Sequence, residues 1–249
     1  ADAERLNKLG LRSEQIKPLQ NTTINCASDK KMIGQLAGGF LPYIFIAFGF
    51  IGCMYPAIDL FTGEKERGTL ETLLTVPVSR WKILVGKMLV VVSSGMLAAT
   101  CALLGLFISI EFLDLAANKE LLDVIHSVLT PTFIISMFAL LMPLVIFFAG
   151  VMIPIAIYAK SFKEAQSIIT PLNIVMVLPA MIGFFPGIEL NFTTAFIPVV
   201  NVVLATKELI GGTLSLGSFL SVFGVMFLLA CVAISLSLRQ FGKESNILN

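Results

Sequence analysis

Five charge-free stretches, each long enough to cross a bilayer, constrain the fold of this chain more than any other feature of its sequence. A membrane-spanning helix needs about 20 predominantly apolar residues. The stretches cover residues 32–58, 88–110, 127–159, 165–185 and 214–238. Only 13% of the residues are charged and 57% are hydrophobic, whereas a soluble domain carries about 25% charged residues. The sequence therefore predicts an all-α membrane protein with five spans.

The charge balance and the reactive side chains argue against other classes of function. A net charge of +1 provides no concentrated basic face for a nucleic acid. The single histidine, His126, has no cysteine or histidine nearby, and the four cysteines show no metal-binding or disulfide spacing. The sequence contains no GxxxxGK[ST] phosphate-binding loop.

Lysine and arginine collect in some of the loops between the spans, and this pattern orients the chain. Five lie in residues 62–87, two in residues 160–163 and two beyond residue 238, whereas the loops at 111–126 and 186–212 have one each. Because cytoplasmic loops are rich in lysine and arginine, the rich loops are predicted to be cytoplasmic. Alternation through five spans then places the N-terminal segment outside. We expect an upstream helix to deliver that segment, and six spans in the complete protein.

The apolar run at residues 190–206 does not fit a further crossing. It is short and contains four residues that interrupt a span, Thr193, Thr194, Pro198 and Asn201. Two short helices that enter the membrane and return fit this run better. The predicted domains are the end of an extracytoplasmic segment, a transmembrane domain with a re-entrant pair of helices, and a cytoplasmic tail. Their ranges are 1–31, 32–238 (re-entrant pair at about 188–212) and 239–249.

The loop at residues 62–87 is predicted to contain a short amphipathic helix. Leu70, Leu73 and Leu74 have the i, i+3, i+4 spacing of one helical face. Gly68 and Thr69 can start this helix, and Pro77 ends it. From physical chemistry alone, such a helix either anchors the loop at the membrane interface or docks into a cytoplasmic partner.

The residues of this loop resemble the signature of a known family. The run GEKERGTLETLL, residues 63–74, is similar to the signature of ABC-2 type transporter permeases. Further segments resemble the sodium-efflux branch of that family, the NatB-like permeases: MYPAIDL at 54–60, PVSR at 77–80, GK at 86–87, SFKEAQ at 161–166 and IPVVN at 197–201. The resemblance extends over nearly the whole chain. NatB-like permeases have an extra N-terminal helix and an extracytoplasmic domain, which agrees with the upstream helix expected from charge.

This resemblance implies an ABC-2 (type V exporter-like) transmembrane domain with a cytoplasmic coupling helix at about 63–76. In the family, that helix seats in a groove of the ATP-binding subunit, which here would be NatA-like. The three leucines would form an apolar plug, the charged residues a rim that fixes the register, and Gly68 a close turn. The predicted ATPase-coupling residues are Glu64, Glu66, Arg67, Gly68, Thr69, Leu70, Glu71, Leu73 and Leu74.

The resemblance also implies partners, location and function. The permease would not be an enzyme and would bind no cofactor itself, with ATP and Mg²⁺ on the partner subunit. It would form a homodimer or a pair of permease subunits, because one copy has too few spans to enclose a pathway. The location would be the cytoplasmic membrane of a bacterium or archaeon. Sodium efflux is the implied function, and export of a peptide, drug or lipid is the alternative. A non-catalytic scaffold and an intramembrane enzyme are alternatives from other classes, although one loop histidine supplies no catalytic pair.

Few groups at membrane depth could bind a sodium ion, which needs hard oxygen ligands. The candidates are Asn173, Asn201, Gln35 and the backbone carbonyls freed by Pro143, Pro154 or Pro171. Asp59, Glu189 and Glu208 all fall at span ends, so no mid-span carboxylate marks an ion site. The two asparagines suit interhelical hydrogen bonds equally well.

Overall fold

The computed structural model describes residues 29–69, 72, 77–112 and 130–241. All regular elements within these residues are helices. Five helices are long and apolar enough to cross a membrane: Ala37–Glu66, Arg80–Leu106, Pro131–Tyr158, Phe162–Phe184 and Leu216–Gln240. The predicted all-α architecture with five spans is confirmed.

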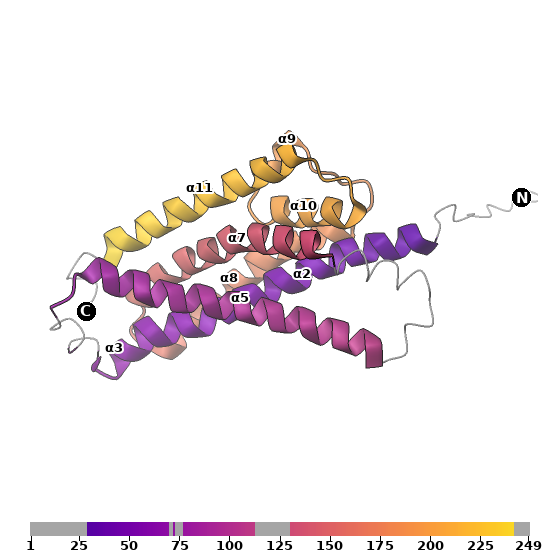
Figure 1. Cartoon of the computed structure of the whole chain (residues 1–249). Helices are drawn as coiled ribbons and strands as arrows, with labels where there is room; N and C mark the ends of the chain where they lie inside the picture. The colour runs from indigo at the N-terminus through magenta and orange to yellow at the C-terminus, as the bar shows by residue number, and fades with distance from the viewer. Residues whose placement is uncertain (1–28, 70–71, 73–76, 113–129, 242–249) are drawn as a thin grey trace, which may run out of the picture.

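The first span combines three elements: helix α2 (Asp29–Ile58), the π-helical segment η1 (Asp59–Gly63) and α3 (Glu64–Glu66). The fourth span is α8 (Phe162–Val177), which continues as the 3₁₀ segment η3 (Leu178–Phe184). The other elements are α5 (Arg80–Phe112), α7 (Pro131–Tyr158), α9 (Phe192–Ala195), α10 (Val200–Gly211) and α11 (Leu216–Phe241). In Figure 1, α3, the start of α5 and the last turns of α11 lie at the same end of the bundle, which we call the α3 end. The start of α2 lies at the opposite end.

Helix α7 is the central helix of the bundle. In the most apolar stretch of α7, 67% of the residues are buried. The corresponding share is 17% in α5 and 22% in both the fourth span and α11. It packs mainly against α11 and α2. The α7 segment contains no charged residue, so it can be enclosed without leaving a buried charge. Pro131 opens this helix at the first position, and the Oγ1 atom of Thr130 accepts a hydrogen bond from the Phe133 N–H at 3.4 Å.

The pair of short helices expected within residues 188–212 is present as α9 and α10. The Asn191 side chain caps α9, and its backbone N–H donates to the Thr194 Oγ1 atom at 2.8 Å. Val199 precedes α10 with a φ of 71°, which is unusual for a β-branched residue. Gly212 ends α10 in the left-handed conformation that favours glycine. The two short helices are therefore bounded by local turn and cap geometry.

The spans at the α3 end extend further than the charge pattern predicts. The first span continues helically to Glu66 instead of ending near Ile58, and α5 begins at Arg80 instead of near Met88. Two of the charged residues that suggested a loop pair with each other: Lys87, on α5, forms an ion pair with Glu64 of α3. The segment between the two spans is therefore much shorter than the predicted loop of residues 62–87.

Helices α2 and α5 approach closely through small residues. A Cβ atom built on Gly95 would lie 2.4 Å from the Cys53 Sγ atom, and one built on Gly52 would lie 2.5 Å from the Ala98 Cβ atom. Such close packing is a main source of helix association in lipid, where apolar burial alone gives no preference for protein over lipid tails. The glycines therefore set the distance between the first two spans.

We expect Gly95→Ala to lower the thermal unfolding midpoint of the detergent-purified protein, because the added methyl group overpacks this contact at a cost of about 1–3 kcal/mol. Gly86→Ala, on the same helix, is the matched control, since a Cβ atom there meets nothing within 4 Å. Equal midpoints for the two variants would contradict the close contact.

Candidate functional site

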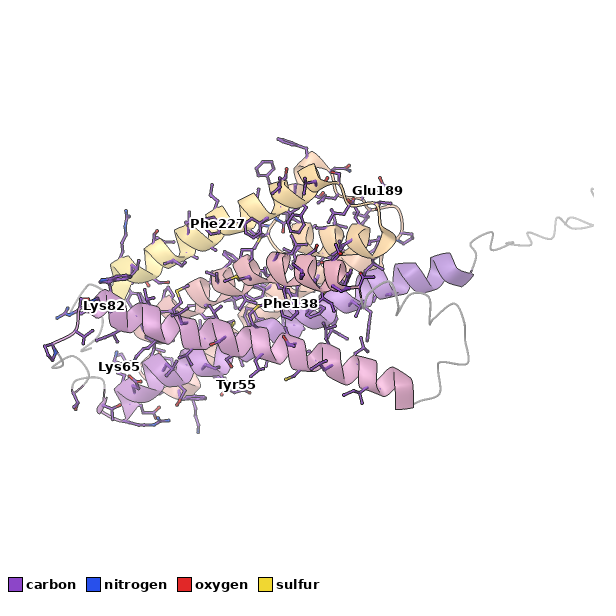
Figure 2. All side chains as sticks on the ribbon, in the orientation of Figure 1. Tyr55, Lys65, Lys82, Phe138, Glu189 and Phe227 are labelled. Carbon is purple, nitrogen blue, oxygen red and sulfur yellow. The ribbon has the colours of Figure 1, made fainter. Side chains whose placement is uncertain are left out.

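Six polar residues at the α3 end attach the start of the family-like signature to the neighbouring helices. We call this group the polar anchor; it consists of Asp59, Thr62, Glu64, Glu66, Arg67 and Lys87. The first five belong to the end of the first span and to the turn that follows it, whereas Lys87 comes from α5. Figure 2 shows Lys65 and Lys82 at this end of the bundle and Glu189 away from it.

Lys87 is a buried charged member of the polar anchor, with 9% of its side chain exposed. Its Nζ atom forms an ion pair with the Glu64 carboxylate, donates to the Leu60 carbonyl at 2.5 Å, and lies 5.0 Å from the centroid of the Phe61 ring. A buried charge is tolerated only where a counter-ion and hydrogen bonds replace water. The end of the first span therefore supplies a complete set of partners for a lysine on the second.

Two further members of the polar anchor satisfy the ends of other helices. The buried Thr62 Oγ1 atom donates to the Ala156 carbonyl in the last turn of α7 at 2.6 Å. The Glu66 carboxylate accepts from the Phe162 N–H in the first turn of α8 at 3.1 Å. Helix ends leave such carbonyl and N–H groups without intrahelical partners, and a carboxylate at a helix N-terminus is favourable. The signature segment is thus attached to α7 and α8 as well as to α5.

The remaining ion pair of the polar anchor is exposed. The Arg67 guanidinium lies 2.6 Å from the Asp59 carboxylate, and the two side chains are 64% and 48% exposed. Surface ion pairs of this kind contribute little to stability. A Cβ atom on Gly63 would lie 2.8 Å from the Asp59 Oδ1 atom, so the glycine leaves room for this pair. Gly68 follows with a φ of 70°, which provides the close turn expected there.

The structure describes only some of the predicted coupling residues. Thr69 is exposed, and its hydroxyl donates to the Glu64 carbonyl at 3.2 Å. Glu64, Glu66 and Arg67, predicted as a rim for a partner protein, all have partners within this chain. The proposed apolar plug of Leu70, Leu73 and Leu74, and the rim residue Glu71, lie outside the described residues. Their docking role stays a prediction.

The structure describes the side chains of two of the three residues predicted to line a substrate pathway. Asn201 is fully buried in the first turn of α10; its Nδ2 atom donates to the Ala195 carbonyl at 3.0 Å, and its Oδ1 atom accepts from the Val202 N–H at 2.8 Å. This asparagine therefore joins α9 to α10. In α8, the Nδ2 atom of Asn173 is buried and has no hydrogen-bond partner among the described residues. The side chain of Gln35 lies outside the described residues.

One of the predicted ion-binding carbonyls is already occupied. Pro154 lacks an N–H group and so leaves the Gly150 carbonyl without its intrahelical donor. The buried Ser237 hydroxyl of α11 donates to that carbonyl at 2.8 Å. A Cβ atom on Gly150 would lie 2.6 Å from the Ala233 Cβ atom, so the glycine also permits this close approach. The sequence analysis missed Ser237, because nothing in its local pattern indicates which distant carbonyl it meets.

Away from the α3 end, α10 is attached to the segment that precedes α9. The Lys207 Nζ atom donates to the Phe185 carbonyl at 2.9 Å, and the Glu208 carboxylate accepts from the Leu190 N–H at 3.0 Å. Burial lowers the pKa of Lys207, and the negative charge of Glu189 acts in the opposite direction. The charges in this region, like those of the polar anchor, thus stabilise connections between segments.

Comparison with known proteins identifies the family. A family model described as "ABC-2 family transporter protein" matches residues 3–245. The chain belongs to the ABC-2 transporter family. It is 29% identical over 253 residues to "ABC transporter permease protein NatB" of Bacillus subtilis (strain 168), an alignment that covers 98% of this chain and 63% of that protein. No solved structure matches the chain.

The predicted resemblance to ABC-2 permeases is therefore confirmed, and with it the transmembrane fold. Together with five apolar helices, the family match makes this a multi-pass membrane protein. This ABC-2 chain spans 63% of the length of its Bacillus subtilis relative. Within the signature, Glu64, Glu66 and Arg67 belong to the polar anchor, so in this family member these charged residues contact the membrane helices.

We expect Ser237→Ala to lower the stability of this ABC-2 chain by about 1 kcal/mol, because the Gly150 carbonyl loses its donor. Ser235→Ala is the matched control on the same helix, since the exposed Ser235 hydroxyl bonds only to Cys231 within its own helix. Thermal unfolding of both variants in the same detergent measures the difference. An unchanged midpoint for Ser237→Ala would show that the interhelical bond contributes nothing.

Proposed function

We propose that this chain is the membrane-spanning part of an ABC exporter permease that works with a separate ATP-binding subunit. The observation that carries the proposal is the polar anchor, which attaches the family signature to α5 and α8, and Thr62, directly before the signature, to α7. A subunit that docks on residues 63–76 and closes on ATP would displace this segment. Because the segment is bonded to three other helices, its displacement would shift the spans between two arrangements.

In this proposal, the leucine face at residues 70, 73 and 74 is the docking surface, and ATP and Mg²⁺ bind to the partner subunit. The signature and the other loops rich in lysine and arginine face the cytoplasm, because cytoplasmic loops are enriched in these residues. Two permease chains enclose the pathway in a bacterial or archaeal cytoplasmic membrane. The partner is NatA-like, since the Bacillus subtilis relative carries the name NatB.

Sodium ions are the proposed cargo, supported by the NatB name of the relative. The structure also favours a second candidate, an amphipathic peptide, drug or lipid. Two of the oxygen groups considered for sodium, the Asn201 side chain and the Gly150 carbonyl, are engaged in hydrogen bonds within the chain. A cargo that requires few buried oxygen ligands is consistent with the engagement of these groups.

The direct test is to express the full-length protein with its ATP-binding subunit, purify the complex and reconstitute it in vesicles. We expect the two proteins to co-purify and ATP to drive sodium transport, with potassium in place of sodium as the control cation. An ATP-binding subunit that cannot hydrolyse ATP should abolish transport. Co-purification without sodium transport would favour the amphipathic cargo, and no co-purification would contradict the permease proposal.

Within that complex, we expect Arg67→Glu to lower cargo transport per ATP hydrolysed by about fivefold or more, the lower range of a coupling effect. The substitution places a negative charge beside Asp59 and changes the turn that leads into the docking segment. Membrane insertion should be unchanged, because the native ion pair is exposed. Lys65→Glu is the matched control, with the same charge change in the same segment. Wild-type coupling in Arg67→Glu would count against a role for this turn.

A further inference from the structure

We infer that Lys87 is a positioning residue that transmits displacement of the signature segment to helix α5. The inference rests on the proposed function, because it requires an ATP-binding subunit that moves the segment. It goes beyond that function by assigning transmission to one buried ion pair on a different helix from the signature.

The contacts of Lys87 set it apart from another lysine on the same helix. The Lys87 ammonium reaches Leu60, Phe61 and Glu64, three residues in the last turns of the first span. Lys82, also on α5, is exposed to solvent at the α3 end. Lys87 therefore makes a directed connection between the two spans, whereas Lys82 serves as a comparison of equal charge.

The local helix geometry presents suitable partners to Lys87. The first span changes from α-helix to π-helix over Asp59–Gly63, and single π-helical turns inside α-helices often mark functional positions. The Leu60 carbonyl lies within this turn and accepts from the lysine, while Glu64 follows directly after it. Separation of Lys87 from these groups would leave a buried charge without a counter-ion. The end of the first span and the start of α5 are thereby required to move together.

The packing of α5 makes it the helix that can respond. Only 17% of the residues in its most apolar stretch are buried, and it packs mainly on α2. That contact includes the close approach at Gly52 and Gly95, well along the helix from Lys87. The two helices are in close contact at these glycines, but no hydrogen bond joins them there among the described residues. A pull on the Lys87 end would therefore tilt α5 about this contact against the rest of the bundle.

The test uses the full-length permease bound to its ATP-binding subunit, with spin labels at the exposed residues Leu104 on α5 and Leu228 on α11. We expect nucleotide to change the distance between the labels by about 2 Å or more, the scale of helix shifts in switching proteins. Lys87→Met should abolish this change while the ATP-binding subunit still co-purifies and hydrolyses ATP. Lys82→Met should respond as the wild type does.

Exchanging the charges of Glu64 and Lys87 distinguishes a role of the ion pair in transmitting movement from a role in stability alone. Glu64→Lys and Lys87→Glu should each abolish the distance change, and the double variant should restore part of it, because the ion pair is then present with reversed ends while the Leu60 carbonyl loses its donor. This readout requires no knowledge of the cargo. If Lys87→Met fails to insert in the membrane, the double variant decides the test.

Three results would overturn the inference alone while leaving the permease proposal standing, provided that the ATP-binding subunit is retained. They are a normal distance change in Lys87→Met, no recovery or no insertion of the double variant, and no distance change in the wild type. Loss of the ATP-binding subunit from the wild-type complex would instead overturn the proposed function, and this inference with it.

Discussion

The burial of one lysine charge determines how the α3 end of this bundle is built. Lys87 lies on a membrane-spanning helix and is almost completely enclosed. Its partners, the Glu64 carboxylate and the Leu60 carbonyl, both come from the end of the first span. Because an unpaired charge cannot remain in such a place, the first span has to continue helically past Ile58, and α5 has to begin before Lys87. One ion pair thus explains both extensions of the predicted spans.

The same requirement applies to uncharged polar groups throughout the described part of the bundle. In a membrane interior, backbone groups released by proline or by helix ends need partners from the protein. Ser237 supplies one for the Gly150 carbonyl, Thr62 one for Ala156, and Glu66 one for Phe162. Each of these bonds joins two different helices. The same side chains therefore provide hydrogen bonds for the backbone groups and attach the helices to each other.

This arrangement gives the family signature two roles. Its leading charged residues hold the segment against the bundle, and the leucine-faced part that follows is proposed to meet the ATP-binding subunit. A segment that is both attached and exposed can receive a force and pass it on. From the sequence, both the leading charged residues and the leucines are predicted to face the partner. Spacing along one helix does not show that Glu64, Glu66 and Arg67 have partners within the chain.

The sequence by itself determined the helical membrane fold, the five spans, the short helix pair and the family, because hydropathy, proline position and the signature are properties of contiguous residues. Tertiary structure alone decided where the first two spans meet, which carbonyl Ser237 reaches, and that Asn201 joins α9 to α10. The physical reason is that these features depend on pairs of groups from separate segments. Glu64 and Lys87 are 23 residues apart, and Gly150 and Ser237 are 87 apart; only helix packing brings such groups within bonding distance.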